Sequence, residues 1–538
     1  MSVLFGIIVP NSAVYVLPGA IVIGNIDLDV FTQALWAKTN PYHPLWCHLL
    51  DTGAVCERLL DCFGCPDDIP PKWVIYLSAL HDIGKADPEF QVLDDVQVDR
   101  LQGFGLSLPS RYDGFRHESR SGVWMGKHLR ECGWSSSTVR MVAATLRAHH
   151  GNFTPKPCAP SEESPEHDLW EQIRDRIAEM LADTIGIPDE QSAPAGVTNA
   201  SATGVKLIGL NVLSDWIASN EELFRYPSLN TEVTPSDYWQ QARTEAARAV
   251  SALQLVQLGN CITSLANPSF RDIWPQITSL RSSQQALEDA CRGSIPPGLA
   301  IIEAPMGEGK TESAIYLSEC WKLQNGSCGA YIALPTMATS NQMHGRYREF
   351  LRKRRPCVSS LRLVHGMSWL VDDVSLESGF EILGDSSEEE NMLARDWFNP
   401  SKRALIAPEG VGTIDQALMA ALNVKHGFLR LLGLSSKVLI VDEVHAYDEY
   451  MTTILERLLE WCRVLRIPVI MLSATLSQPQ KLRLINAYGG VVQEDTDIIE
   501  PYPLITIVPL DGSETRVIPV EAQTSRTVHV KQHLGKHR

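Results

Sequence analysis

The chemistry of this sequence starts with two adjacent residues, His81 and Asp82, which close the apolar run Leu77–Leu80. An imidazole binds borderline transition metals, whereas a carboxylate has two oxygens and can bridge a pair of ions. A single His-Asp pair is more often an ordinary helix cap or surface pair, so a metal site needs further ligands. Candidates occur elsewhere in the chain, within apolar and helix-like stretches: His48, His117, His149, His150 and Asp215.

These flanking stretches are of the kind that turns a polar residue towards a protein core. A buried histidine or aspartate without a partner is unfavourable, so convergence of these side chains on metal ions is the economical interpretation. For any one of them alone, a hydrogen-bonded core or surface residue is the commoner situation. Lys85, one turn after the pair, could offset charge that develops on a phosphate, although a solvated lysine at a helix C-terminus accounts for it equally well.

The order H…HD…H…HH…D resembles the HD phosphohydrolase superfamily, and in particular the nuclease domain of the CRISPR-associated helicase-nuclease of type I systems. The resemblance implies that one metal ion is held by His48, His81, Asp82 and Asp215. It implies that a second is held by Asp82 as the bridge, with His117, His149 and His150. Such a pair activates water and clamps the attacking and leaving oxygens of a phosphodiester. Histidine-rich ligation favours iron, manganese, nickel or cobalt over magnesium here.

A second candidate site follows a short apolar, strand-like run. Residues Ala304–Thr311 read APMGEGKT and lead into an apolar helix, which is the context that a phosphate-binding loop requires. Gly307 and Gly309 would let backbone N–H groups close on phosphate oxygens, Lys310 would reach the β and γ phosphates, and Thr311 would bind magnesium. The sequence therefore predicts ATP and magnesium as ligands of this part of the chain.

The matching half of that site is the acidic pair Asp442 and Glu443, which ends another apolar strand-like run. Asp442 would hold magnesium and Glu443 would orient the attacking water. Alone, such a pair is by default surface charge. Together with the phosphate-binding loop and Ser473–Thr475, however, it resembles a DEAH-type superfamily 2 helicase. By the same resemblance Gln284 is the residue expected to read adenine, although the adjacent Gln285 is an alternative.

Two further segments, Ala333–Met343 and Trp397–Ala417, are similar to the CRISPR-associated family. In superfamily 2 proteins, loops at these places hold the sugar-phosphate backbone of one strand. The resemblance implies contacts with single-stranded DNA from Thr336, Thr339, Asn341, Gln342 and Thr413. Capping of the following helices is an alternative role for Thr336 and Thr413. The basic run Arg346–Arg355 is more simply a solvated helix face than a DNA surface.

The spacing of apolar residues divides the chain into two main parts. Helical spacing dominates from Trp36 to about Val250, whereas after roughly Leu265 short apolar runs alternate with helical stretches, which predicts a buried parallel sheet. The expected fold class is multidomain, with an all-α HD-type metal domain followed by an α/β RecA-like domain. The expected strands are 299–303, 331–334, 361–364, 404–407, 438–441 and 469–472. The expected domains are an N-terminal extension (1–34), the HD-type domain (35–264, with a surface insertion at about 151–203), the first RecA-like domain (265–500) and the start of a second (501–538).

Composition limits the partners and the compartment. With a formal net charge of −17, any contact with DNA must come from local basic patches, metal ions or helix N-termini. The cysteines are scattered, and the single close pair Cys62 and Cys65 favours reduced cytosolic thiols over a zinc site. The apolar run Val3–Gly24 is broken by prolines and lacks a positive flank, so it fits neither a secretory signal nor a membrane span. We therefore expect a cytoplasmic protein without a membrane partner.

The family resemblance implies a function in antiviral CRISPR interference. The expected protein is recruited by the surveillance complex Cascade, and it nicks and degrades single-stranded DNA while ATP drives translocation. No arginine-finger motif of a second RecA-like domain follows Thr475, so we expect ATP-dependent unwinding to be incomplete in this chain. Two alternatives remain open: a remnant or split subunit that binds nucleotide or DNA without turnover, and an HD nucleotide phosphohydrolase.

Overall fold

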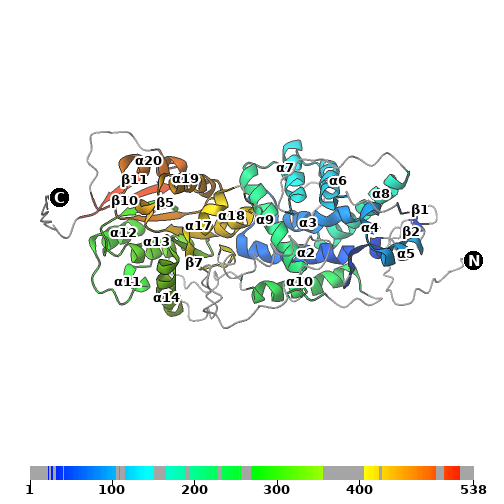
Figure 1. The fold of residues 1–538 in the computed structure, drawn as a ribbon, viewed down its shortest axis with the longest axis horizontal. Helices are drawn as coiled ribbons and strands as arrows, with labels where there is room; N and C mark the ends of the chain where they lie inside the picture. Colours follow the sequence, from blue (N-terminus) through cyan, green and yellow to red (C-terminus); the bar gives the residue numbers. More distant parts are fainter. Residues whose placement is uncertain are drawn as a thin grey trace, which may run out of the picture. The chain divides into compact units, whose positions relative to one another are not determined.

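The fold is that of a computed structural model, which describes the greater part of the chain. The described residues are 22–23, 26–27, 32–39, 41–103, 108–109, 115–150, 165–187, 194, 196–221, 223–226, 233–253, 255, 268–354, 405–422, 424, 427–491 and 502–521. The chain divides into a helical unit (1–260, 360–410 and 415–436) and a sheet unit (261–359, 411–414 and 437–538). Figure 1 shows the elements of each unit. None of the described helices is long and apolar enough to cross a membrane.

The helical unit is built around helix α2 (Leu45–Phe63), which packs against α3 (Pro71–Ala79), α9 (Ala200–Ala218) and α10 (Pro235–Ala252). α9 is buried on most of its surface, as expected of a helix that is apolar nearly all round. The other elements before α9 are β1 (Val22–Ile23), β2 (Ile26–Asp27), β3 (Trp36–Thr39), β4 (Tyr42–Pro44), η1 (Leu80–Lys85), α4 (Pro88–Gln91), α5 (Asp95–Gly103), α6 (His117–Glu131), α7 (Ser136–Arg147) and α8 (Pro165–Ile185). The all-α prediction for this unit is confirmed, apart from the short hairpins β1–β2 and β3–β4.

Helix α8 belongs to the core of the helical unit. Trp170, Ile177 and Leu181 are buried in that core, and the hydroxyl of Tyr76 donates to the carbonyl of Ala178 at 3.2 Å. The sequence predicts a helix near Trp170–Ile185 within the insertion, and α8 is that helix. The predicted surface position is wrong for it, because its apolar side chains pack into the core.

A segment from much later in the chain completes the same core. After α17 (Ile414–Leu418) and η5 (Met419–Ala421), helix α18 (Gly427–Ser435) packs against α9. A Cβ atom on Gly209 of α9 would lie only 2.9 Å from the side chain of Leu432, so the close approach of the two helices requires glycine at this position. Residues 415–436, expected within the RecA-like domain, thus lie in the helical unit.

We expect Leu432→Ala to destabilise the helical unit by about 2–5 kcal/mol, because it leaves a cavity against Gly209 in a well-packed core. Hydrogen exchange of the α9 amides measures the effect, and exchange should become faster. Leu422→Ala is the control, since that side chain is 38% exposed and its loss should leave exchange unchanged. Normal protection of α9 in the Leu432→Ala chain would contradict a role of α18 in this core.

The sheet unit contains a seven-stranded sheet with the strand order β11-β10-β5-β9-β8-β6-β7. β5, β9, β8 and β6 are parallel, whereas β10 is antiparallel to β5 and to β11. The strands are β5 (Gly298–Glu303), β6 (Gly329–Leu334), β7 (Gly410–Thr413), β8 (Lys437–Val441), β9 (Val469–Ser473), β10 (Leu504–Pro509) and β11 (Arg516–Pro519). The helices are α11 (Phe270–Ile273), α12 (Ser282–Arg292), α13 (Lys310–Asn325), α14 (Met337–Arg354), η6 (Val444–Ala446), α19 (Glu449–Val464) and α20 (Gln478–Ala487).

Four of the predicted strands are confirmed and one is wrong. β5, β6, β8 and β9 occupy the expected positions, whereas Leu405 and Ile406 are helical and the strand begins at Gly410. The strand predicted at 361–364 lies outside the described residues. β10 and β11, assigned by sequence to a second domain, extend the edge of this sheet beside β5. The mostly parallel sheet places the carboxyl ends of its central strands along one edge, where ligands bind in α/β folds.

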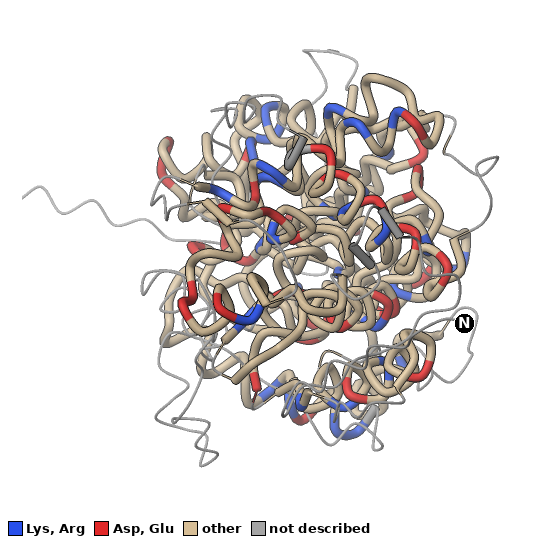
Figure 2. Tube along the Cα trace, turned by 90° about the vertical axis from the view of Figure 1, so that its right-hand side faces the viewer, with Lys and Arg blue, Asp and Glu red and all other residues tan. Residues whose placement is uncertain are grey.

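Charge is mixed along the chain. Lysines and arginines alternate with acidic residues over the described trace in the view of Figure 2. The negative net charge therefore does not indicate which surface could bind DNA.

Candidate metal and nucleotide sites

The predicted metal ligands of the helical unit meet around the buried carboxylate of Asp82. Its Oδ2 atom lies 3.2 Å from His48 Nε2 and 3.4 Å from His81 Nε2. Its Oδ1 atom lies 3.4 Å from His117 Nε2 and 3.5 Å from His149 Nε2. The two oxygens of one carboxylate therefore face different pairs of histidines.

Two ligands predicted by sequence complete these groups. Asp215 Oδ1 lies 3.6 Å from both His48 Nε2 and His81 Nε2, and His150 Nε2 lies 3.1 Å from His117 Nε2. Among the described residues, two groups have ligand atoms close enough to share an ion: His48, His81, Asp82 and Asp215, and His117, His149 and His150. The first group is the set implied for one ion, whereas the second lacks Asp82, whose Oδ1 lies 3.4–3.5 Å from His117 and His149. Metal binding by these residues stays a prediction. Cys62 and Cys65 belong to neither group, and their thiols donate to backbone carbonyls.

Five elements deliver these ligands. His48 lies on α2, His81 and Asp82 on η1, His117 at the start of α6, His149 and His150 just after α7, and Asp215 on α9. A Cβ atom on Gly84 would lie 2.1 Å from the carbonyl oxygen of His117 and 2.6 Å from the nitrogen of Ser121. Only glycine at position 84 therefore lets η1 approach α6 closely enough to bring His117 to Asp82.

Backbone carbonyls fix the orientation of two histidines. Nδ1 of His81 lies 2.9 Å from the carbonyl of Ser78, and Nδ1 of His149 lies 2.5 Å from that of Leu146. A carbonyl only accepts, so Nδ1 carries a proton in both rings, and Nε2 is the nitrogen that faces the site. His81 Nε2, His149 Nε2 and Asp82 Oδ1 are buried without a hydrogen-bond partner. Such orphaned atoms are unusual in a core unless they bind an ion, so the residues fit a metal centre.

The electrostatics of the site favour bound cations. Burial lowers the pKa of His48 to about 3, which leaves the ring neutral and able to act as a ligand at neutral pH. Burial also opposes charge on His81, but the carboxylates of Asp82 and Asp215 outweigh it and raise the pKa of that ring to about 10. Despite their burial, the two carboxyls keep a pKa below the usual range, mainly because of the charge of His81. Both are therefore ionised at neutral pH.

Lys85 is part of this site. Its ammonium lies 2.8 Å from Asp82 Oδ2 and the residue is only 6% exposed. The alternative of a solvated lysine is therefore wrong.

The predicted phosphate-binding loop lies between β5 and α13. Gly307 and Gly309 have φ values of 83° and 73°, a left-handed conformation that favours glycine. Gly309 is the N-cap of α13, so the helix N-terminus opens into the loop, as phosphate binding requires. The Lys310 ammonium donates to the carbonyls of Ala304 and Pro305 at 2.7 and 3.3 Å. Thr311 follows on the first turn of α13.

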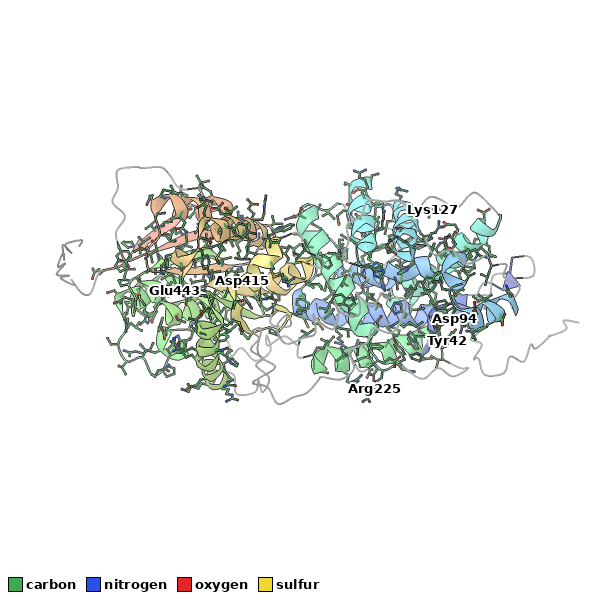
Figure 3. The ribbon with its side chains drawn as sticks, viewed as in Figure 1. Tyr42, Asp94, Lys127, Arg225, Asp415 and Glu443 are labelled. Carbon is green, nitrogen blue, oxygen red and sulfur yellow. The ribbon has the colours of Figure 1, made fainter. Side chains whose placement is uncertain are left out.

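The predicted acidic pair follows β8 at the same edge of the sheet. Glu443, labelled in Figure 3, has a left-handed φ of 56°, and its N–H donates to Asp442 Oδ1 at 2.8 Å. Burial raises the pKa of Asp442 to about 6. His445 Nε2 lies 3.1 Å from Glu443 Oε2, and its Nδ1 lies 3.4 Å from the hydroxyl of Ser473. The sequence patterns predict no role for His445, although its position three residues after Asp442 could have indicated one.

Gln284 has a structural role beside this loop. The side chain is 2% exposed, and its Oε1 accepts from the N–H of Arg281, which caps α12. A Cβ on Gly309 would lie 2.3 Å from its amide nitrogen, so Gln284 borders the phosphate-binding loop. Its role in adenine recognition stays a prediction.

The residues predicted to contact DNA lie at two helix starts. Thr336, Thr339, Asn341 and Gln342 are exposed at or just before the first turns of α14, and Thr413 ends β7. Thr336 Oγ1 accepts from the N–H of Thr339 at 3.3 Å, so the capping role is present. DNA contact stays a prediction for all five. In the basic run, Arg346 pairs with Glu312 and Lys353 with Glu349, and both basic residues are exposed.

A buried ion pair links the two halves of the nucleotide site. Glu303, the last residue of β5, lies 2.8 Å from Lys481 of α20, and both are almost fully buried. The same carboxylate accepts from the N–H of Leu476, just after Thr475. The start of the phosphate-binding loop is thus tied to the segment after β9.

We expect Lys481→Met to destabilise the sheet unit by about 3–5 kcal/mol, because it leaves the Glu303 carboxylate buried without its cation. Adding Glu303→Gln should recover most of that loss, since it removes the charge. Urea denaturation of the 538-residue chain measures both effects. Lys353→Met, which removes an exposed pair, is the control and should change nothing. A Lys481→Met chain as stable as this control would contradict the role of the buried pair.

Comparison with known proteins identifies these two units. A family model described as "Cas3, HD domain" matches residues 36–224, and one described as "DEAD/DEAH box helicase" matches residues 283–482. The CRISPR-associated endonuclease/helicase Cas3 of Thermus thermophilus is 34% identical over 513 residues, which cover 92% of this chain and 55% of that protein. The chain thus contains a Cas3-type HD domain and a DEAD/DEAH box helicase domain, and it is similar to Cas3 proteins along most of its length. A Cas3 of Streptococcus thermophilus is 30% identical over 93% of this chain and 56% of that protein.

Solved structures show the same similarity to Cas3. A crystal structure of a CRISPR-associated protein, 34% identical, matches with a TM-score of 0.78 and covers 91% of this chain and 57% of that one. A T. fusca Cas3-AMPPNP structure, 30% identical, matches with a TM-score of 0.76 over 92% of this chain and 57% of that one. This chain spans about half the length of the Cas3 proteins that it matches. Its units are therefore an HD domain and a RecA-like helicase domain.

Proposed function

We propose that this chain is a metal-dependent nuclease that cuts single-stranded DNA, joined to a RecA-like lobe of an ATP-dependent helicase, and that it acts in CRISPR interference. The observation that carries the proposal is the arrangement around Asp82. Its two carboxylate oxygens face two separate groups of histidines, at 3.2–3.5 Å. One carboxylate between two ligand groups is the arrangement expected where two ions share a bridge.

In the proposed site the seven ligands form two sets that share Asp82. One ion would be held by His48, His81, Asp82 and Asp215. The other would be held by His117, His149 and His150 together with Asp82, whose Oδ1 lies 3.4–3.5 Å from His117 and His149. The imidazole-rich donor set suits iron, manganese, nickel or cobalt better than magnesium. When bound, such a pair supplies a water nucleophile and clamps the attacking and leaving oxygens of a phosphodiester.

The protein's own residues prepare that chemistry. The carbonyls of Ser78 and Leu146 hold His81 and His149 in the tautomer that presents Nε2. Lys85 brings a positive charge to within 2.8 Å of Asp82, where it can offset charge that builds up on the cleaved phosphate. Burial of the whole cluster strengthens each of these interactions.

The sheet unit would bind ATP and magnesium at the edge formed by β5 and β8. Lys310 would contact the β and γ phosphates, and Gly307 and Gly309 would admit them to the backbone N–H groups. Thr311 and Asp442 would hold magnesium, and Glu443 would orient water. Gln284, which borders this loop, would recognise adenine. The contacts of His445 with Glu443 and Ser473 would relay the nucleotide state along this edge.

The DNA and the protein partner follow from the family. The exposed residues at the start of α14, together with Thr413, would hold the backbone of one strand. A protein chain in a structure described as a CRISPR RNA-guided surveillance complex, pre-nicking, is 28% identical with a TM-score of 0.65. This likeness supports a partnership with Cascade, and so a cytoplasmic site of action.

Nicking of circular single-stranded DNA with Mn²⁺ in the absence of ATP tests the proposal. A nuclease converts the circle to linear and shorter products, whereas a nucleotide phosphohydrolase consumes deoxynucleoside triphosphates and leaves the circle intact. A chain that does neither, with metal bound, would be the binding remnant and would contradict the proposal.

We expect Asp82→Asn to lose more nuclease activity than any single His→Ala variant, because Asp82 alone faces both ligand groups. The loss should exceed the roughly 10–100-fold that changes outside a metal's ligand set produce. Metal analysis of the purified variant should find fewer than two ions per chain. Lys310→Ala is the matched control, since it alters the nucleotide site and should leave nicking intact. Two tightly bound transition-metal ions in the Asp82→Asn chain would refute the bridging role.

A further inference from the structure

The hairpin β3–β4 contains a buried lysine that the proposed mechanism does not use. Lys38 is 3% exposed, and its ammonium donates to the backbone carbonyl of Ser219 at 3.2 Å and to the hydroxyl of Tyr226 at 3.0 Å. In the part of the chain that the structure describes, no carboxylate lies within ion-pair distance of this nitrogen. Burial of an ammonium whose hydrogen-bond acceptors are neutral is unfavourable, and the largest favourable charge acting on it is that of Asp215, which suggests a role beyond packing.

One set of contacts leads from Lys38 to the metal site. Ser219 is the C-cap of α9, and its hydroxyl donates to Asp215 Oδ1 at 2.9 Å. Its N–H also donates to the carbonyl of Asp215 at 2.7 Å. Lys38 therefore fixes the residue that in turn fixes the Asp215 carboxylate. A cation at a helix C-terminus is also favoured by the helix dipole.

The second strand of the hairpin, β4, contacts α2, the helix that carries His48. His43 pairs with Lys38 across the hairpin, and its ring stacks on Tyr226 with centroids 3.9 Å apart. His43 Nε2 lies 2.8 Å from Asp51 Oδ2, which also accepts from the hydroxyl of Tyr238. Asp51 lies one turn after His48 on α2. The hairpin thus contacts α2, which carries His48, and the end of α9, which carries Asp215.

We infer that Lys38 is a positioning residue for the ion at His48, His81, Asp82 and Asp215, and that it acts through Ser219. The contacts just described reach the His48 and Asp215 side of the cluster, whereas the group of His117, His149 and His150 stands on α6 and after α7. Loss of Lys38 should therefore lower the affinity for one ion and leave the affinity for the other unchanged. This inference rests on the proposed two-metal site.

Titration of Mn²⁺ alone into the 538-residue chain, followed by calorimetry and by the electron paramagnetic resonance of free Mn²⁺, tests it. The wild-type chain should bind two ions. In Lys38→Met one affinity should fall roughly 10–100-fold, as is typical when a partner of a metal ligand is removed, and the other should stay within about two-fold. His117→Ala identifies the second binding event, because it removes a ligand of that group only. A general loss of structure would weaken both ions together.

Two further variants sharpen the result. Lys127→Met is the control, since that lysine is 54% exposed in its side chain and pairs with Glu171 away from the cluster; it should bind both ions normally. Ser219→Ala should weaken the same ion as Lys38→Met, and the double variant should be little worse than either alone.

Circular dichroism checks folding. A folded Lys38→Met chain with two unchanged Mn²⁺ affinities would overturn the inference and leave the proposed function standing. If Lys38→Met fails to fold, Ser219→Ala decides, and unchanged Mn²⁺ binding there overturns the inference. A wild-type chain that binds fewer than two ions would overturn the proposed two-metal site, and this inference with it.

Discussion

The burial of the Asp82 carboxylate is the constraint on which the helical unit depends. Removing an ionised carboxylate from water is unfavourable by several kcal/mol unless charges and donors surround it. Lys85 at 2.8 Å and the four surrounding histidines compensate for it here. Lys85 and His81 lie on η1 with Asp82, whereas His48, His117 and His149 come from other parts of the sequence, so the apolar core must hold their helices close to η1. Gly84 at η1 and Gly209 on α9 mark two places where only a hydrogen fits.

A different principle organises the sheet unit. Its ligand-binding groups do not gather in a core but follow the carboxyl ends of parallel strands, where loops are free to carry them. The phosphate-binding loop follows β5, the acidic pair follows β8, and the segment after β9 is tied back to β5 by Glu303 and Lys481. His445 joins the second and third of these at 3.1–3.4 Å. These contacts couple the positions of neighbouring loops.

The sequence predicts a site well where its residues follow a recognisable spacing along the chain. The seven candidate metal ligands and the APMGEGKT loop stand in spacings that only a few functions use, and the structure brings the residues of each set together. The sequence does not predict the features that depend on packing between distant parts of the chain. Nothing in the sequence of α18 indicates that it packs on α9, and nothing in β10 distinguishes an edge strand of this sheet from the first strand of another. Lys38 resembles a surface lysine beside Trp36, because its burial depends on α9 and Tyr226, which lie roughly 180 residues later.

The central claim is that Asp82 joins two metal ions in one site. Anomalous diffraction from crystals of this chain grown with Mn²⁺ tests it most directly, because it locates the ions without reference to activity. The account predicts two anomalous peaks about 3.5–4 Å apart, the spacing of two-metal hydrolytic sites, with one peak beside each oxygen of Asp82. A single peak, or two peaks of which only one touches this carboxylate, would contradict it.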